Sequence, residues 1–317
     1  MSEPAAEFRL IARHFGPLAG PGALGLLDDA AVLVTPAGRE LVLAADAMVA
    51  GVHFLPDDPP DLVGAKLLRV NLSDLAAMGA APLGYLLTVS VPRDTPDTWL
   101  AGFAAGLARD QAAFGLTLLG GDTTSTPGPI SLSLTILGHV SPGQALRRSG
   151  ARPGDEIWVT GTIGDGALGL LALRGRVADP DGTLADRYRL PQPRLGLALH
   201  GLATAGMDVS DGLVQDLGHL CRAAGIGAVV EADLVPLSDA ARAVGPEWLT
   251  ACLTGGDDYE LLLAVPRRST EAFRAEAARN GISVNCIGRF VPEPGVTILG
   301  AEGIPMHISQ PGWNHFG

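Results

Sequence analysis

The sequence predicts an α/β (α+β) protein built from two domains. Its 317 residues exceed the length that one hydrophobic core usually serves. Short apolar runs typical of strands alternate with stretches of helical periodicity. A polar, turn-rich segment after His139 interrupts this alternation, and a second α/β pattern follows it. We therefore expect one domain over 1–140 and another over 141–317.

The first domain is predicted to begin with a short amphipathic helix over 5–15. Two longer helices are expected over 61–79, where apolar residues recur every three or four positions, and over 97–114. The apolar runs around them have the length and composition of strands. These predicted strands are 30–35, 40–46, 83–92, 115–122 and 130–140.

The second domain repeats the alternation of strands and helices. Its predicted strands are 156–161, 227–234, 261–266 and 285–290. Its predicted helices are 166–175, 193–204 and 216–225. The glycines at 161, 164 and 166 follow a strand and open a helix, but their spacing is GxxGxG instead of the dinucleotide-binding GxGxxG. A tight turn between strand and helix is the better interpretation.

The charge balance restricts the partners. With 22 basic and 34 acidic residues the net charge is −12, whereas nucleic-acid binding needs a basic surface. Anionic membranes are disfavoured for the same reason, and no apolar stretch is long enough to cross a bilayer. Cys221, Cys252 and Cys286 are far apart and form no CxxC pair. We expect reduced, buried thiols in a cytoplasmic protein.

Aspartates at the ends of apolar elements, or beside glycines, are the most informative pattern. They are Asp46, Asp74, Asp122, Asp208, Asp211, Asp257 and Asp258, to which the adjacent pair Asp28 and Asp29 is added. Strand ends are where α/β proteins place their sites. Carboxylates that converge repel one another unless cations neutralise them, and an oxygen-only ligand set favours Mg²⁺. The pattern predicts a Mg²⁺–nucleotide site, while for any single aspartate a turn or helix cap is the alternative.

The absence of other motifs from the sequence argues against several catalytic mechanisms. The sequence contains no GxxxxGK[ST] phosphate-binding loop and no GxSxG or Cys–His pattern of a covalent nucleophile. His53 closes an apolar stretch, where packing and ligand contact are equally good interpretations from local sequence.

Nine segments together resemble the thiamine-monophosphate kinase family of the PurM-like (aminoimidazole ribonucleotide synthetase-like) superfamily. They are LLDDAAVL, ADAMVAGVHFLPD, VNLSDLAAMGA, LLGGDTT, ALRRSGARPGD, VTGTIGDGALGL, MDVSDGL, TGGDDYEL and GWNHF. The resemblance implies a ferredoxin-like N-terminal domain, an α/β C-terminal domain and ATP held near the domain junction. It also implies a homodimer in which two N-terminal domains pair their sheets.

The same resemblance implies roles for individual residues. The family's Mg²⁺ ligands match Asp29, Asp46, Asp74, Asp122, Asp208 and Asp211. Its ATP contacts match Gly121, Asp122, Arg148 and Ser210. Its substrate contacts match His53, Asp257 and Trp313. Asp122, Arg148 and Asp208 are the implied catalytic residues, and Asp28 has a weaker claim than Asp29.

The implied reaction transfers the γ-phosphoryl group of ATP to thiamine monophosphate. The accepting phosphate is already anionic near neutral pH, so direct in-line attack needs no general base. The sequence departs from the family at Leu27 (usually Gly), at Ala44 and Ala45 (usually hydroxyl residues) and at Asp257 (usually Glu). The alternatives are another ATP-using member of the superfamily or a catalytically silent nucleotide-binding protein. Ala44 and Ala45 are the support for the silent protein.

Overall fold

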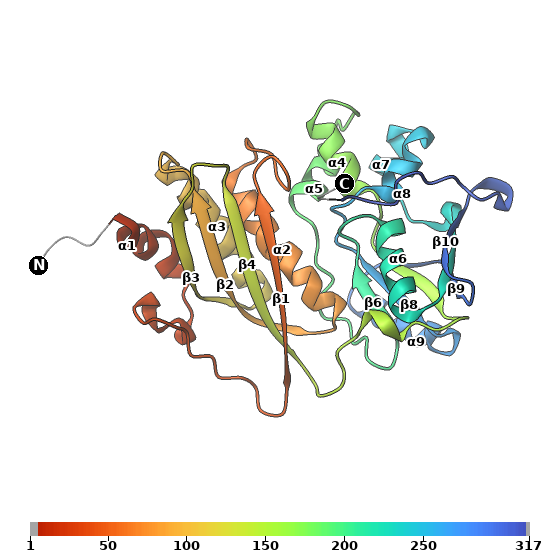
Figure 1. Cartoon of the computed structure of the whole chain (residues 1–317), viewed down its shortest axis with the longest axis horizontal. Coiled ribbons are helices and arrows are strands. Elements are labelled where there is room, and N and C mark those ends of the chain that lie inside the picture. The colour runs from red at the N-terminus through yellow and green to blue at the C-terminus, as the bar shows by residue number, and fades with distance from the viewer. Residues whose placement is uncertain (1–5, 315–317) are drawn as a thin grey trace, which may run out of the picture. The chain divides into compact units, whose positions relative to one another are not determined.

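The computed structural model describes residues 6–314 and divides them into two compact units (Figure 1). Unit 1 comprises residues 6–75 and 80–143, and unit 2 comprises residues 76–79 and 144–314. Each unit has its own sheet with helices packed against it. The prediction of an α/β protein with two domains is therefore confirmed.

Unit 1 is built on a four-stranded sheet in the order β1-β4-β2-β3. Its strands are β1 (Glu40–Val49), β2 (Ala81–Val91), β3 (Thr117–Ser125) and β4 (Ser131–Val140). The β1–β4 and β2–β4 pairs are antiparallel, and the β2–β3 pair is parallel. Helices α2 (Pro60–Ala77) and α3 (Asp97–Phe114) cover one face of this sheet (Figure 1). The predictions of both helices and of these four strands are confirmed to within a few residues.

The two faces of this sheet differ in burial. Along β4, buried and half-buried residues alternate, as the two-residue period of a strand requires. Leu132, Leu134 and Ile136 are fully buried on the helix-covered face. On the opposite face, Leu41 and Leu43 of β1 are 43% and 59% exposed. The face of the sheet opposite α2 and α3 therefore leaves large apolar side chains of β1 exposed within the chain.

The N-terminal segment differs from its prediction in two places. The expected helix over 5–15 is α1 (Ala6–Leu10) followed by a π-helical turn, Ile11–Phe15. The expected strand over 30–35 is wrong, because the chain is irregular there. Val32 and Val34 are 61% and 87% exposed, and the run has no neighbouring strand to satisfy its backbone groups.

Unit 2 contains a six-stranded mixed sheet in the order β10-β7-β9-β5-β8-β6. Its strands are β5 (Glu156–Thr160), β6 (Ala205–Asp208), β7 (Gly227–Glu231), β8 (Leu261–Val265), β9 (Val284–Val291) and β10 (Gly295–Leu299). Its helices are α4 (Asp165–Leu173), α5 (Thr183–Arg189), α6 (Leu213–Ala224), α7 (Asp239–Val244), α8 (Leu249–Thr254) and α9 (Thr270–Arg279). Every strand predicted in this unit is present.

The predicted helix over 193–204 is wrong, because this segment is irregular. Gly196 and Gly201 have φ of 89° and 76°, a left-handed conformation that interrupts helical hydrogen bonding. A side chain from α9 fixes the segment instead, since the Ala198 N–H donates to Glu276 Oε1 at 2.9 Å. No helix among residues 6–314 is long and apolar enough to cross a membrane.

Candidate active site

Gly121 occupies a position on β3 that only glycine fits. Its φ is 155°, and a Cβ atom there would lie 1.7 Å from the Leu87 carbonyl oxygen of the neighbouring β2. The register places Asp46, Leu134, Leu87 and Gly121 in one row across the sheet. Close packing of β3 against β2 therefore requires glycine at this position, and the ATP contact of Gly121 stays a prediction.

Asp122 points to the face of the sheet opposite α2 and α3. Asp122 pairs with Thr88 of β2, and Thr88 pairs with Ser133 of β4. This row lies one residue along the strands from the row that contains Asp46. Successive strand residues alternate between faces, so Asp122 and Asp46 point to opposite faces of the sheet. Asp122 is exposed, and its Oδ1 accepts the Thr123 N–H at 3.0 Å.

Asp46 lies on the helix-covered side of the sheet, and Asn71 joins its backbone to α2, the helix that carries Asp74. The Asp46 N–H donates to Asn71 Oδ1 at 3.1 Å, and Asn71 Nδ2 donates to the Leu67 carbonyl at 2.9 Å. Asn71 is fully buried, and Asp74 follows it by three residues on the same face of α2. Both aspartates are half-buried. The sequence shows the Asn71–Asp74 spacing but not the role of Asn71, which depends on β1 lying beside α2.

Asp28 and Asp29 share a cavity with Gly121 and Asp122. This cavity of about 650 Å³ lies within unit 1, and apolar side chains from the N-terminal segment, β2 and β3 form the rest of its wall. Leu27, which stands where the family usually has Gly, has φ of −110° and so avoids the left-handed region. The cavity thus brings the N-terminal acidic pair to the glycine-rich strand β3.

Backbone contacts define the hydrogen-bonding state of His53. Its Nδ1 accepts the Val49 N–H at 3.0 Å, and the buried Lys66 donates through Nζ to the His53 carbonyl at 3.1 Å. Because Nδ1 is an acceptor here, the neutral ring carries its proton on Nε2. His53 is half-buried, and its substrate contact stays a prediction.

In unit 2, the buried carboxylate of Asp216 accepts hydrogen bonds from the loop between β6 and α6. Asp208 ends β6 and is 5% exposed, and Ser210, Asp211 and Gly212 follow it. All three of these residues donate their backbone N–H to Oδ2 of Asp216, at 3.0, 3.0 and 3.1 Å. Sequence reasoning missed Asp216, since its role depends on how the loop turns back over the first turn of α6.

Three influences act on the pKa of Asp216, which is raised to about 7. Burial is the largest influence and raises the pKa, since the carboxylate is 1% exposed. The backbone N–H donors lower it, while the neighbouring charges of Asp208 and Asp211 raise it. Three acidic groups therefore lie close enough to repel one another in this loop.

The same loop holds the two predicted substrate contacts of unit 2. The Asp257 N–H donates to the Ser210 carbonyl at 2.9 Å, and the Trp313 N–H donates to the Asp211 carbonyl at 2.9 Å. Asp257 has φ of 72°, a strained conformation for a residue other than glycine. Four predicted residues are thereby brought together: Ser210, Asp211, Asp257 and Trp313.

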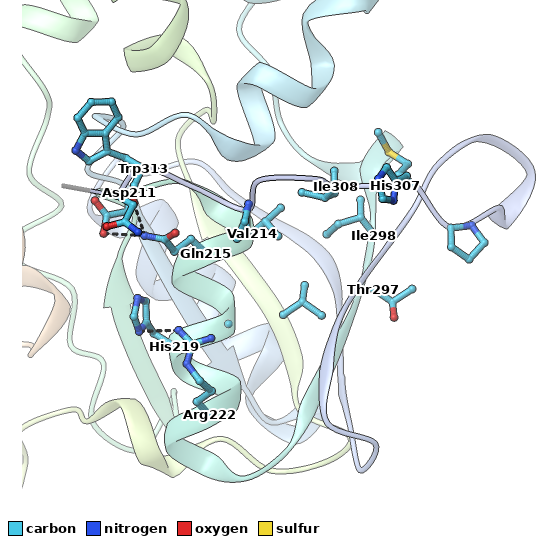
Figure 2. A pocket seen from close by; sticks show the side chains of 16 residues that line it. Asp211, Val214, Gln215, His219, Arg222, Thr297, Ile298, His307, Ile308 and Trp313 are labelled. Atoms are coloured by element: carbon cyan, nitrogen blue, oxygen red, sulfur yellow. Dashed lines mark hydrogen bonds between the residues drawn. The ribbon is translucent and has the colours of Figure 1, made fainter. Parts of the chain in front are cut away.

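Figure 2 shows the cavity beside this loop, which measures about 880 Å³ and lies over α6 and β10. Trp313 lines it with its indole 49% exposed. Gln215 Nε2 donates both to Asp211 Oδ2 at 3.1 Å and to the Trp313 carbonyl at 2.7 Å. The backbone of Trp313 is therefore held at both its N–H and its carbonyl.

Arg148 is exposed on a short 3-10 turn that packs against α6. The pKa of His219, also on α6, is lowered mainly by burial and further by the positive charges of Arg222 and Arg148. Arg222 bonds to the His219 ring at 3.0 Å (Figure 2). The predicted ATP contact Arg148 is thus near the helix that follows Ser210 and Asp211.

The acidic residues fit Mg²⁺ by their chemistry, since they offer only carboxylate oxygens and are in most cases partly exposed. In the part of the chain that the structure describes, Asp211, Asp216 and His219 are the one trio of possible ligands whose binding atoms lie within 4.8 Å of one another. The shared cluster of Asp29, Asp46, Asp74 and Asp208 stays a prediction.

Asp258 has a structural role that separates it from Asp257. It is fully buried and accepts the N–H groups of Gly164 and Gly166, at 2.7 and 3.0 Å, at the start of α4. Burial raises its pKa well above the usual range. Of this adjacent pair, only Asp257 remains a site candidate.

Comparisons with known proteins agree with the fold. The AIR synthase related protein models match this chain, the N-terminal domain over residues 27–140 and the C-terminal domain over 152–300. The thiamine-monophosphate kinase of Caulobacter vibrioides is 47% identical, covering 98% of this chain and 91% of its own length.

Two solved structures are also similar. The thiamine-monophosphate kinase of Stenotrophomonas maltophilia has a TM-score of 0.82 and 38% identity, covering 96% of this chain and 98% of that one. The structure of AaThiL complexed with AMPPCP and TMP has a TM-score of 0.78 and 29% identity, covering 93% of this chain and 97% of that one. Because the identity extends over both domains, the chain belongs to the thiamine-monophosphate kinase family of AIR synthase related proteins.

Proposed function

We propose that this protein transfers the γ-phosphoryl group of ATP to thiamine monophosphate in the presence of Mg²⁺, giving thiamine diphosphate and ADP. The observation that carries the proposal is the loop after β6, where Ser210 and Asp211 are hydrogen-bonded to Asp257 and Trp313. Predicted nucleotide residues and predicted thiamine residues thus share one short segment. The similar protein AaThiL has been seen with both AMPPCP and TMP, which supports the same pair of ligands.

The chain supplies alignment and charge in this reaction. The accepting phosphate oxygen is already anionic, so no side chain need remove a proton before attack. Arg148 is exposed and positively charged, and we assign it to the phosphate oxygens of ATP, as the catalytic cation. Mg²⁺, when bound, would neutralise charge on the transferring phosphates. We expect several Mg²⁺ ions, because Asp46 and Asp122 point to opposite faces of the sheet. The residues that would hold them are Asp29, Asp46, Asp74, Asp122, Asp208 and Asp211.

The remaining candidates serve the acceptor. Trp313 offers a half-exposed indole face, against which an aromatic thiamine ring would stack. His53 presents an Nε2–H donor, and Asp257 is held in place by its own backbone N–H. These groups bind and orient thiamine monophosphate, so we expect them to affect its affinity more than that of ATP.

An assay of ADP release tests the proposed reaction. We expect ADP to form from ATP and Mg²⁺ only when thiamine monophosphate is added, with one thiamine diphosphate produced for each ADP. Coupled spectrophotometry and chromatography of the thiamine esters measure the two products. If ADP were released only with an acceptor other than thiamine monophosphate, the protein would have another ATP-using activity of the superfamily. ATP binding without turnover would indicate a silent protein.

We further propose that two chains pair through the sheet face of unit 1 opposite α2 and α3. Leu41, Leu43 and Leu86 are 43%, 59% and 40% exposed on that face, an unusual display of large apolar side chains on two strands of one sheet. We expect light scattering to give the mass of two chains, and Leu43→Asp to shift it toward one. Ile304→Asp is the matched control, because Ile304 is equally exposed but lies in unit 2. A monomeric wild-type chain would contradict this proposal.

A further inference from the structure

Asp216 is a buried group that contacts three consecutive residues of the loop after β6. Its Oδ2 accepts three consecutive backbone N–H groups, those of Ser210, Asp211 and Gly212. Successive N–H groups that converge in this way form a concave anion-binding arrangement. Here a side chain of the protein fills the concavity, so the ligand of the arrangement is internal.

The carbonyl groups of the same loop point to other segments. The peptide group between Val209 and Ser210 donates its N–H to Asp216. Its carbonyl accepts the Tyr259 N–H at 2.8 Å. The next peptide group donates its Asp211 N–H to Asp216 and accepts the Asp257 N–H on its Ser210 carbonyl.

The third peptide group repeats the arrangement toward the C-terminal segment. Its Gly212 N–H donates to Asp216, and its Asp211 carbonyl accepts the Trp313 N–H. Each of three consecutive peptide groups is therefore held at both ends, by Asp216 on one side and by a distant segment on the other. A rotation of any one plane would break two hydrogen bonds at once.

We infer that Asp216 is a positioning residue that sets the loop carrying Ser210 and Asp211 and, through the loop's carbonyls, the backbones of Asp257 and Trp313. This inference rests on the proposed function and deepens it. Asp216 touches neither substrate, and its effect passes through the three peptide groups. Loss of its carboxylate would therefore disturb nucleotide binding and thiamine monophosphate binding together.

The binding of two probes measures this effect. Calorimetry with AMPPCP and Mg²⁺, and then with thiamine monophosphate added, gives two dissociation constants without requiring turnover. For Asp216→Ala we expect both constants to rise at least about tenfold and kcat to fall about 100-fold, the scale expected when reacting groups are misplaced by about 1 Å. Asp216→Asn keeps an acceptor oxygen without the charge, so both constants should rise only about three- to tenfold.

Two further variants separate positioning from a general loss of stability. Asp155 is a matched control in unit 2, because it is 7% exposed and its Oδ2 accepts the Arg152 N–H at 3.1 Å and the Thr204 hydroxyl at 2.6 Å. Asp155→Ala should lower Tm but leave both dissociation constants within twofold of the wild type. Trp313→Ala should weaken the binding of thiamine monophosphate but not that of AMPPCP.

The inference is overturned if folded Asp216→Ala binds both probes within twofold of the wild type, or loses only one of them. Equal weakening in Asp155→Ala would also overturn it. Where Asp216→Ala does not fold, Asp216→Asn decides, since unchanged constants in that variant would refute positioning. A wild-type chain that binds both probes but releases no ADP would refute only the proposed reaction, and one that binds neither would refute both.

Discussion

Asp208→Ala and Asp122→Ala are each expected to lower kcat at least about 1,000-fold, because each removes a carboxylate assigned to Mg²⁺ and to the transferring phosphates. Neither change should unfold the chain. Asp122 is exposed, and its Oδ1 accepts the N–H of the adjacent Thr123. Asp208 is buried, but it repels Asp216, so its removal relieves an unfavourable interaction.

The measurement combines initial rates over a range of Mg²⁺ concentrations with thermal denaturation. We expect the free energy of unfolding to change by no more than about 1 kcal/mol in either variant. Asp94→Ala is the control for Asp122, because Asp94 is also an exposed aspartate of unit 1 and has no assigned role. Near-normal turnover of both variants at saturating Mg²⁺ would refute the assignment of these carboxylates.

The regular elements could be predicted where local pattern and tertiary environment agree. Helix α3 begins and ends where the apolar period predicts, and β4 alternates as a strand with one covered face should. The run over 30–35 has the same composition as these strands but no neighbour to pair with. Pairing partners are a property of the tertiary fold, so composition alone cannot supply them.

The residue types of the site could be predicted from the sequence, but the hydrogen bonds between them could not. Asp208 and Asp211 stand out because they flank a strand end and a glycine. Asp216 does not, because an aspartate in the first turn of a helix is commonplace. Its importance comes from three N–H groups that converge only once the loop has folded. In the same way, Asp257 and Asp258 are neighbours in sequence with different roles, since only the backbone turn directs Asp258 inward.

Glu260→Ala is expected to destabilise the protein by about 3–5 kcal/mol, which is the usual effect of removing one partner of a buried ion pair. Glu260 is fully buried, and both of its oxygens are engaged. Arg194 donates to both oxygens, at 2.6 and 2.5 Å, while Arg187 donates to Oε1 at 2.9 Å and the Thr160 hydroxyl to Oε2 at 2.7 Å. Without the carboxylate, two guanidinium groups that are 17% and 21% exposed lose their shared counter-charge.

Urea unfolding followed by circular dichroism measures this loss as a lower midpoint. Glu260→Gln keeps the shape and two polar atoms, so its loss should be smaller than that of Glu260→Ala but still clear, because the charge that Arg187 and Arg194 share is removed. Arg187 keeps a second carboxylate, that of Asp165, at 3.7 Å. Glu156 is the contrasting case, since its pairing with the exposed Arg267 is 3.9 Å long and should contribute less than about 1 kcal/mol as an ion pair. If Glu260→Ala unfolded at the wild-type midpoint, the assigned role of Glu260 in stability would be refuted. Glu260 lies one residue after Tyr259 and three after Asp257. If Glu260→Ala lowered the midpoint but the folded fraction kept the wild-type ligand affinities, Glu260 would serve stability alone. Its role would then differ from the positioning that we assign to Asp216.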